Sequence, residues 1–348
     1  MLLRNSFEDF LTGTVSLDDT RMSRVQSAHR SVRRKLKGIE AVRAVLTGFY
    51  LQGSYALLTA CRPCGDQTEY DVDLVLAADF RDDRGRLPSG WRVLNWLQRQ
   101  IESISLYEGK TTVKKCCVRI DYESDGQRFH LDVVPAHRPD TKQGVIRVAP
   151  GWGYSNPRGY KRWFELRRKR SKRLRHVVRL LKYWRNLQEC GPNSMILTTL
   201  AARHAPKEFR SLDDALVKTM RGMNGWLQEQ NIYGAQVLNP SLEEEDLARD
   251  WWGMDVAMFQ HLLGAATDKA EEALASKDEA ETIELWNGAK LFDGRFPKTL
   301  RGLGEDAKAA AEAIGDGLAV TPAGLVSIGA GRSCPTVEKG GGFYGEKK

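Results

Sequence analysis

The chain has 348 residues, of which 28% are charged and 41% hydrophobic, and its formal net charge is +8. This length allows two lobes or two small domains with a sizeable core, and the composition is ordinary for a globular protein. There is no run of 18 or more apolar residues, which excludes a membrane-spanning helix. The N-terminal MLLRNSFEDF lacks the apolar stretch of a signal peptide. We therefore expect a cytoplasmic protein whose six cysteines are free thiols.

The positive charge is concentrated in two segments. Twelve Lys or Arg lie between positions 161 and 185, and seven lie between positions 21 and 37. Such clusters favour a polyanionic partner, whether nucleotide, nucleic acid or phosphate. The alternative is a solvated helix face without a binding role.

The front half of the chain predicts mixed α and β structure. Apolar residues at helical spacing predict helices over 17–48 and 91–106, the first of them opening with the cap-like SLDDT. Alternating patterns predict strands over 70–76, 111–122 and 127–134. The ESDG between the last two strands is a turn signal, so we expect these strands to form a hairpin.

The back half predicts almost only helix. The stretch 137–157 is rich in Pro and Gly and is expected to be a connector. Helical patterns then follow over 159–189, 194–203, 211–230, 243–275, 277–292 and 305–314. We expect three parts: a core with a long N-terminal helix over 1–158, an α-helical lobe over 159–314, and a glycine-rich, flexible tail over 315–348.

Two aspartates on the predicted strand 70–76 are the first candidates for chemistry. Residues two apart on a strand project from the same face, so the carboxylates of Asp71 and Asp73 lie side by side. On an otherwise apolar strand they would repel each other unless a cation lay between them. Hard oxygen ligands suit Mg²⁺. The alternative is an exposed edge strand with two solvated acids.

Two further features favour the metal site. Gly53 and Ser54 lie upstream, where glycine permits close approach of a phosphate and serine can donate to it. Asp132 is a lone acid in the apolar strand FHLDVVP and is costly to bury unless paired. As a third ligand, it would let two metals stabilise both the attacking oxygen and the leaving pyrophosphate. An ion pair with one of the many arginines is the alternative for Asp132.

The segments QGSYALLT, EYDVDLVL and LDVVP closely resemble the GS…DxD…D pattern of the polymerase β-like nucleotidyltransferases. More narrowly, they resemble the cGAS-like bacterial branch, the CD-NTases, which are second-messenger oligonucleotide or dinucleotide synthases of anti-phage defence. RLLKYWRN followed by CGPNSMILTTLA is similar to the helical segment that contacts the donor triphosphate in that family. The resemblance therefore points to Lys182 and Ser194, and it spans residues 5–300.

The resemblance implies a fold and an activity. The fold would be α+β, a polymerase β-like nucleotidyltransferase core (a mixed sheet with flanking helices) followed by an α-helical lobe, with the active site in the cleft between them. The activity would be metal-dependent synthesis of cyclic di- or oligonucleotides from ribonucleoside triphosphates with release of pyrophosphate. Two Mg²⁺ ions, for which Mn²⁺ can substitute, would be held by Asp71, Asp73 and Asp132. Nucleotide would be bound by Gly53, Ser54 and the two helical-lobe residues.

The sequence also departs from the family. The aromatic residue that stacks on the base in the animal enzyme is here Met195, and the zinc-thumb motif is missing, so DNA activation of that type is not expected. We also expect no zinc site from Cys61-x-x-Cys64 and Cys116-Cys117, because neighbouring residues on a strand point to opposite faces. Within the basic segment 161–185 we expect Lys182 and Arg179 to face the cleft and the other cations to be solvated. His130 shares the parity of the third aspartate and is expected behind the metal ligands at most.

Other interpretations stay open at this stage. A nucleotidyltransferase acting on RNA ends or on another acceptor would also fit the basic surface. A non-catalytic nucleic-acid-binding protein is a third class, against which the intact Gly-Ser and three aspartates argue. The family resemblance also allows a regulatory protein or nucleic-acid ligand, and conjugation of the C-terminus to other proteins, although a plain disordered terminus is favoured over conjugation.

Overall fold

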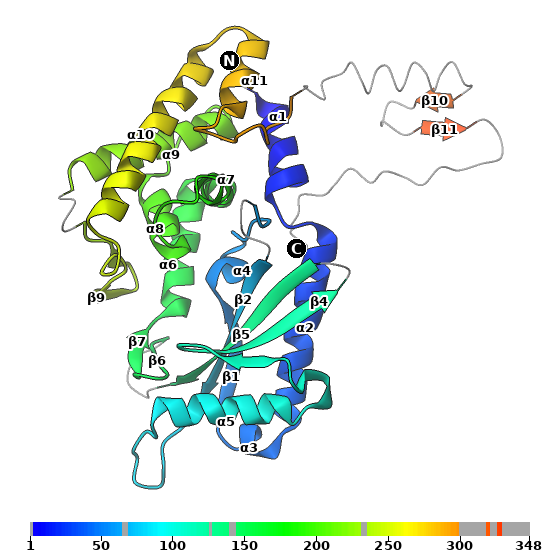
Figure 1. Cartoon of the computed structure of the whole chain (residues 1–348), viewed down its shortest axis with the longest axis vertical. Coiled ribbons are helices and arrows are strands. Elements are labelled where there is room, and N and C mark those ends of the chain that lie inside the picture. Colours follow the sequence, from blue (N-terminus) through cyan, green and yellow to red (C-terminus); the bar gives the residue numbers. More distant parts are fainter. Residues whose placement is uncertain are drawn as a thin grey trace. The chain divides into compact units, whose positions relative to one another are not determined.

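The structure is a computed structural model, and its chain divides into two units, Met1–Lys298 and Thr299–Lys348, which are described separately (Figure 1). The structure describes backbone and side chains for most of the first unit. In the second unit it describes only the backbone of two short strands. The described residues are 3–64, 69–124, 127–138, 144–230, 235–298, 318–320 and 326–328. Among them, none of the helices combines the length and apolar composition that crossing a membrane requires.

A seven-stranded sheet forms the centre of the first unit. Its strands are β1 (Leu46–Gln52), β2 (Glu69–Ala78), β3 (Thr111–Val113), β4 (Val118–Ser124), β5 (Gln127–His137), β6 (Ile146–Val148) and β7 (Gly153–Ser155). The spatial order is β1-β2-β5-β4-β3, and β6 pairs with β5 and β7. β2 and β5 are parallel neighbours, whereas the β1–β2 and β4–β5 pairs are antiparallel. The sheet is mixed, as predicted, and β4 and β5 form the expected hairpin. The predicted single strand 111–122 is wrong, because its two ends form the separate strands β3 and β4, which pair with each other.

Helices flank the sheet and build the second lobe (Figure 1). Those that precede or interrupt the strands are α1 (Arg4–Phe10), the π-helix η1 (Leu11–Val15), α2 (Asp19–Gly38), α3 (Glu40–Arg43), α4 (Gly53–Leu57), α5 (Gly90–Glu102) and the 3₁₀ helix η2 (Ser105–Tyr107). Those that follow are α6 (Pro157–Arg170), α7 (Leu174–Leu187), α8 (Ser194–His204), α9 (Leu212–Gln228), α10 (Met254–Ala275) and α11 (Glu279–Asn287). The short strands β8 (Leu238–Asn239) and β9 (Leu242–Asp246) pair between α9 and α10.

The alternation of side chains along β2 gives the sheet two different faces. Val72 and Leu74 are buried on one face, where Leu131 of β5 lies opposite Val72. The other face carries Asp71 and Asp73. The burial of an apolar set on one face therefore places the two carboxylates together on the other face, as the sequence pattern predicted.

The long helix α2 begins as predicted and ends earlier than predicted. The carboxylate of Asp18 caps it by accepting a hydrogen bond from the Arg21 amide at 2.8 Å. The helix ends at Gly38, after which Ile39 is extended, and the predicted helix 17–48 is wrong at its C-terminal end. Residues 46–52 instead form β1, because their aromatic and β-branched side chains pair with β2 and this tertiary pairing overrides the local helical spacing.

Three other predictions need correction. The predicted helix 159–189 is two helices, since Ser171 is extended and follows four consecutive cations in the last turn of α6. The predicted helix 243–275 begins at Met254, because the acidic segment before it pairs as β9 with β8 and Gly253 turns the chain at φ +61°. The connector 137–157 contains the short strands β6 and β7, which continue the sheet from β5.

The N-terminal segment packs on the helical lobe. The ring centroids of Phe7 and Trp286 are 4.7 Å apart, and those of Phe10 and Phe292 are also 4.7 Å apart. The amide of Leu3 donates to Asp213 Oδ2 at 3.1 Å. The lobes are therefore joined by an aromatic cluster as well as by the chain at α6, and the division at 158/159 stays a prediction.

In the second unit, β10 (Leu318–Val320) and β11 (Val326–Ile328) pair in antiparallel fashion. The rest of the predicted tail 315–348 and the predicted helix 305–314 lie outside the described residues. Conjugation through the C-terminus stays a prediction.

Candidate active site

Asp73 and Asp132 lie directly opposite each other on neighbouring strands. In the parallel β2–β5 pairing, Asp73 is in register with Asp132 and Asp71 with His130. Residues paired in register project from the same face of a sheet. The three predicted carboxylates are thus brought together on one face of two central strands, although 59 residues of chain separate the second from the third.

Gly53 allows a close approach of the backbone to Asp73, whereas the predicted approach of a phosphate to it stays a prediction. It has φ +68°, a conformation that favours glycine, at the junction of β1 and α4. A Cβ atom there would lie 3.2 Å from Asp73 Cγ and inside contact distance of Asp73 Oδ2. The carbonyl of Ser54 then accepts a hydrogen bond from the Thr59 amide at 2.9 Å, which fixes the short turn of helix. Only glycine lets this loop pass over the second aspartate.

A cavity of about 420 Å³ lies between the core and the helical lobe. It is lined from the core by Gly53, Ser54, Asp71 and Asp73, and from the lobe by residues of α6, α7, α8 and β8. The residues that sequence reasoning missed are polar or aromatic: Gln52, Ser155, Asn156, Tyr160, Lys161, Asn193, Thr198 and Asn239. Gln52, Asn193 and Thr198 lie inside the segments that carry the family resemblance, and Lys161 lies in the basic segment, where it was expected to be solvated. Asp132 does not line this cavity.

Lys182 and Ser194 both line the cavity, as the resemblance implied. Lys182 is 3% exposed, and its Nζ donates to the carbonyl and hydroxyl oxygens of Thr59 at 3.4 and 3.3 Å. Burial lowers the pKa of Lys182 to about 8, with the nearby Cys61 and Asp73 acting in the opposite direction. The ammonium group is therefore held in a desolvated position beside the second aspartate, where a phosphate would be a favourable partner.

Ser194 is the first residue of α8. Asn193 caps this helix by accepting hydrogen bonds from the amides of Met195 and Ile196 at 3.0 Å each. Arg185 of α7 donates to Ser194 Oγ at 3.3 Å. Met195, in place of the family's aromatic residue, also lines the cavity and is 38% exposed.

Arg179 does not face the cavity, contrary to the prediction. Its guanidinium is buried and donates to the Leu58 carbonyl at 3.1 Å and to Ser16 Oγ at 2.9 Å. It ties α7 to the turn after α4 and to the N-terminal segment. The reason is geometric, because α7 presents Lys182 and Arg179 to different parts of the same turn.

The carboxylate of Asp73 is in an unfavourable place for a negative charge. Burial, together with the neighbouring Asp132 and Asp71, raises its pKa to about 7, while Arg119 acts in the opposite direction. A further cation beside the Asp73 carboxylate would favour its ionised form at neutral pH. This observation fits a divalent metal held by the oxygens of Asp71 and Asp73.

Arg119 is the functional candidate that sequence reasoning missed. Its Nε donates to Asp132 Oδ1 and its Nη2 to Asp132 Oδ2, both at 2.9 Å, and the same Nη2 lies 3.5 Å from Asp71 Oδ1. The ion pair with an arginine, which was the alternative role for Asp132, is therefore present, and it lies beside Asp71 and Asp73. Within the described residues, no group of three or more His, Cys, Asp or Glu side chains is arranged around one metal position. Asp132 would have to free one of its oxygens to complete a three-carboxylate site.

His130 lies on the carboxylate face and points toward a different acid. Its Nδ1 is 3.0 Å from Asp121 Oδ1, across the β4–β5 hairpin. It shares a face with Asp132, as its parity predicted, and it is in register with Asp71, but the contact given by the structure is with Asp121.

The fold is that of the polymerase β-like nucleotidyltransferases. Residues 1–167 match the Second Messenger Oligonucleotide or Dinucleotide Synthetase domain. A cyclic AMP-AMP-GMP synthase of Enterobacter hormaechei is 23% identical over 85% of this chain and 92% of its own length. A cyclic AMP-AMP-AMP synthase of Acinetobacter is 24% identical over 86% of this chain and 87% of its own length. Through its first 167 residues, and more weakly over most of its length, the chain is thus similar to the cGAS-like bacterial nucleotidyltransferases, the CD-NTases.

Solved structures share the fold. CdnC of E. coli, determined in a complex with a HORMA protein, superposes with a TM-score of 0.68 at 17% identity and covers 85% of this chain and 98% of its own. CdnG of Bradyrhizobium diazoefficiens in complex with GTP gives 0.66 at 20% identity, covering 84% and 96%. DncV of Vibrio cholerae with a linear pppApG intermediate gives 0.66 at 16% identity, covering 84% and 97%. These likenesses include both lobes, which supports the predicted fold class.

Proposed function

We propose that this chain is a CD-NTase, which joins ribonucleoside triphosphates into a cyclic di- or oligonucleotide second messenger and releases pyrophosphate at each step. In each step a ribose hydroxyl attacks an α-phosphorus, the new P–O bond forms, and the bond to the β-phosphate oxygen breaks. The observation that carries the proposal is the cavity in which Gly53, Ser54, Asp71 and Asp73 of the core face Lys182 and Ser194 of the helical lobe. The names of the two curated relatives, both cyclic trinucleotide synthases, support a cyclic product.

The proposed cofactor is a pair of Mg²⁺ ions, for which Mn²⁺ can substitute. Asp71 and Asp73 would hold them, and Asp132 would join after freeing an oxygen from Arg119. When bound, the ions would supply positive charge at the attacking and leaving oxygens. The raised pKa of Asp73 supports this assignment, because an uncompensated buried carboxylate gains most from a bound cation.

The chain's own residues would bind and orient the donor nucleotide. The loop at Gly53 brings the backbone close to a phosphate without a side chain in the way, and Ser54 offers an amide and a hydroxyl. Lys182 and Ser194 would contact the triphosphate from the other side of the cavity. The desolvated ammonium group of Lys182 would gain a charge-assisted bond there that water does not provide.

The alternative activity is transfer of a nucleotide to an RNA end or another acceptor, which the basic surface of α6 would also suit. One experiment separates the two. The purified full-length protein is incubated with the four ribonucleoside triphosphates and Mg²⁺ or Mn²⁺, with and without a labelled RNA, and the products are analysed by mass spectrometry. Phosphatase-resistant cyclic oligonucleotides are the expected products. Extension of the RNA without cyclic product would replace the proposal by the alternative.

We further propose that the enzyme acts in bacterial anti-phage defence, as CD-NTases do. Its substrates are intracellular nucleotides, which places the proposed reaction in the cytoplasm. A regulatory protein is part of this proposal, since the E. coli relative was solved with a HORMA protein. A nucleic-acid ligand on the basic helices is the other candidate regulator. To test both candidate regulators, product formation by the purified chain alone is compared with that in the presence of DNA, of RNA, or of proteins encoded beside it and co-expressed with it.

A further inference from the structure

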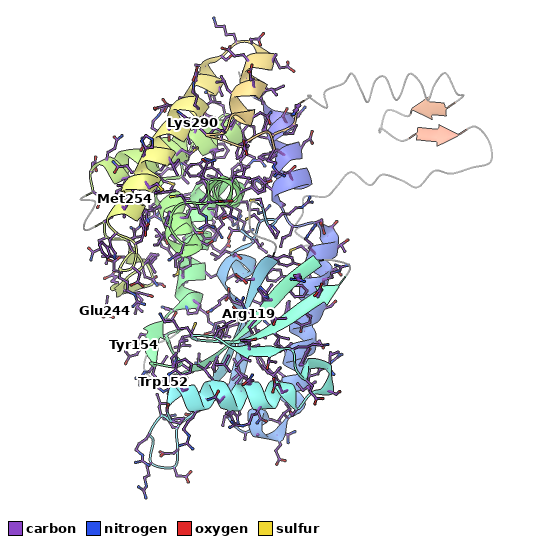
Figure 2. All side chains as sticks on the ribbon, in the orientation of Figure 1. Arg119, Trp152, Tyr154, Glu244, Met254 and Lys290 are labelled. Atoms are coloured by element: carbon purple, nitrogen blue, oxygen red, sulfur yellow. The ribbon has the colours of Figure 1, made fainter. Side chains whose placement is uncertain are left out.

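Arg119 binds the carboxylate of Asp132 through two hydrogen bonds. It lies opposite Asp132 in the antiparallel β4–β5 register, and its Nε and Nη2 each donate to one oxygen of Asp132 at 2.9 Å. This is the parallel two-bond geometry that a guanidinium forms with a carboxylate. The Asp132 side chain is 11% exposed and that of Arg119 is 23% exposed, so water screens the pair only in part. Figure 2 shows Arg119 in the body of the sheet.

The same guanidinium also reaches the first carboxylate. Its Nη2 is 3.5 Å from Oδ1 of Asp71, which is 61% exposed. One cation thus lies between two of the three acids that the proposed function assigns to metal binding. A guanidinium does not lose its proton in proteins. It can therefore give way to another cation only by moving, since deprotonation is not available to it.

We propose that Arg119 is a resident cation of the active site, which neutralises Asp132 and Asp71 in the metal-free protein and competes with divalent metal for them. The inference rests on the proposed function, because it takes these aspartates as metal ligands. Binding of a metal by Asp132 then requires that at least one of its two hydrogen bonds from Arg119 breaks. Arg119 is a positioning residue that acts through Asp132, and it sets how tightly the site binds metal before nucleotide arrives.

The competition has a consequence that a purely structural ion pair lacks. Removing Arg119 leaves two acids without their cation, which destabilises the metal-free protein. A divalent ion can take over that neutralisation, so added metal should restore the stability that the substitution removes. A structural pair would instead be lost equally with and without metal. Arg119→Lys keeps the charge and loses the paired hydrogen bonds, so its stability without metal should lie between those of the wild type and Arg119→Gln.

The test uses Mn²⁺ alone as the probe, on full-length protein stripped with EDTA. Thermal unfolding and isothermal calorimetry are compared for the wild type, Arg119→Gln and Arg119→Lys. Arg81→Gln is the matched control, because Arg81 grips Asp79 through the same kind of two-point contact after the far end of β2. Arg119→Gln should have a lower Tm in EDTA, regain it in Mn²⁺, and bind Mn²⁺ about tenfold more tightly or acquire binding that the wild type lacks. Arg81→Gln should leave Mn²⁺ affinity unchanged.

Three results would overturn the inference: an equal loss of Tm with and without Mn²⁺, an Mn²⁺ affinity unchanged or weakened by Arg119→Gln, or no binding of Mn²⁺ by any variant. If Arg119→Gln does not fold in EDTA, the affinity of Arg119→Lys decides, with a value at or below wild type counting against competition. Failure of the proposed function looks different. In that case the wild type and variants would show the Mn²⁺ pattern while the four triphosphates yield no cyclic product.

Discussion

The carboxylate of Asp73 faces that of Asp132 across the parallel pairing of β2 and β5, and the guanidinium of Arg119 binds Asp132 and reaches Asp71. The first prediction follows from this pair. Asp71→Asn together with Asp73→Asn keeps shape and removes charge, so product formation should fall below about one part in a thousand of wild type. The measurement is cyclic product per hour by mass spectrometry, with circular dichroism to verify the fold. Clear residual turnover in a folded double variant would contradict the metal assignment.

The second prediction concerns Gly53. Gly53→Ala adds a Cβ that meets the Asp73 carboxylate and forces a residue with a side chain into φ +68°. Activity should fall by about 100-fold or more, because the loop and the acid cannot both keep their positions. Gly48→Ala in β1 is the matched control, since a Cβ there meets nothing within 4 Å. Equal activity of the two variants would show that the close approach has no catalytic importance.

Lys182 leads to the third prediction. Lys182→Met keeps the buried stem and removes the charge, so affinity for a non-hydrolysable triphosphate should fall about tenfold or more. Because burial lowers the pKa of Lys182 to about 8, wild-type affinity should also decline as pH rises through that value, and the variant's should not. Calorimetry at pH 7 and pH 9 measures both effects. Lys169→Met, at an exposed position of α6, should match the wild type at both pH values.

The fourth prediction concerns stability and pH without metal. The pKa of Asp73 is raised to about 7 in the folded protein from an ordinary value of 3.8. Its contribution to stability is therefore complete below pH 3.8 and is lost as pH rises through about 7. Asp73→Asn should raise the Tm of EDTA-treated protein at pH 8 by about 2 °C or more, and less at pH 5.5. Asp250→Asn, whose side chain is 87% exposed, serves as the control. A Tm change for Asp73→Asn that does not depend on pH would contradict the raised pKa.

The sequence was sufficient for the site wherever local pattern decides geometry. The alternation along β2 places Asp71 and Asp73 on one face, and the sign of φ at Gly53 follows from the need for a close turn. Arg119 could also have been found. The hairpin pairs Ser124 with Gln127, and counting back along both strands places Arg119 opposite Asp132.

Other features depended on contacts between distant segments. The parallel register of β2 with β5 brings Asp73 to Asp132 across a long stretch of chain, and no local pattern specifies it. The helical spacing that reached Leu46 was overridden because residues 46–52 pair with β2, since tertiary contacts decide when local preferences are weak. Arg179 was misplaced for the same reason. Its position in a basic helix says nothing of the turn carbonyl at Leu58 that it binds.

The last prediction concerns the C-terminal segment. Residues 315–348 hold Gly340, Gly341 and Gly342 in succession and few large apolar side chains, a composition that buries too little surface to offset the cost of ordering. Among the residues that the structure describes, those lining the active-site cavity lie between Gln52 and Asn239, upstream of this segment. Truncation after Asp316 should therefore leave nucleotide synthesis in vitro within about twofold of the full-length enzyme, a change too small to reflect a lost transition-state contact. The comparison uses initial rates at equal concentrations of folded protein, with Tm as the control for stability. A collapse in activity at unchanged Tm would mean that the segment takes part in the reaction.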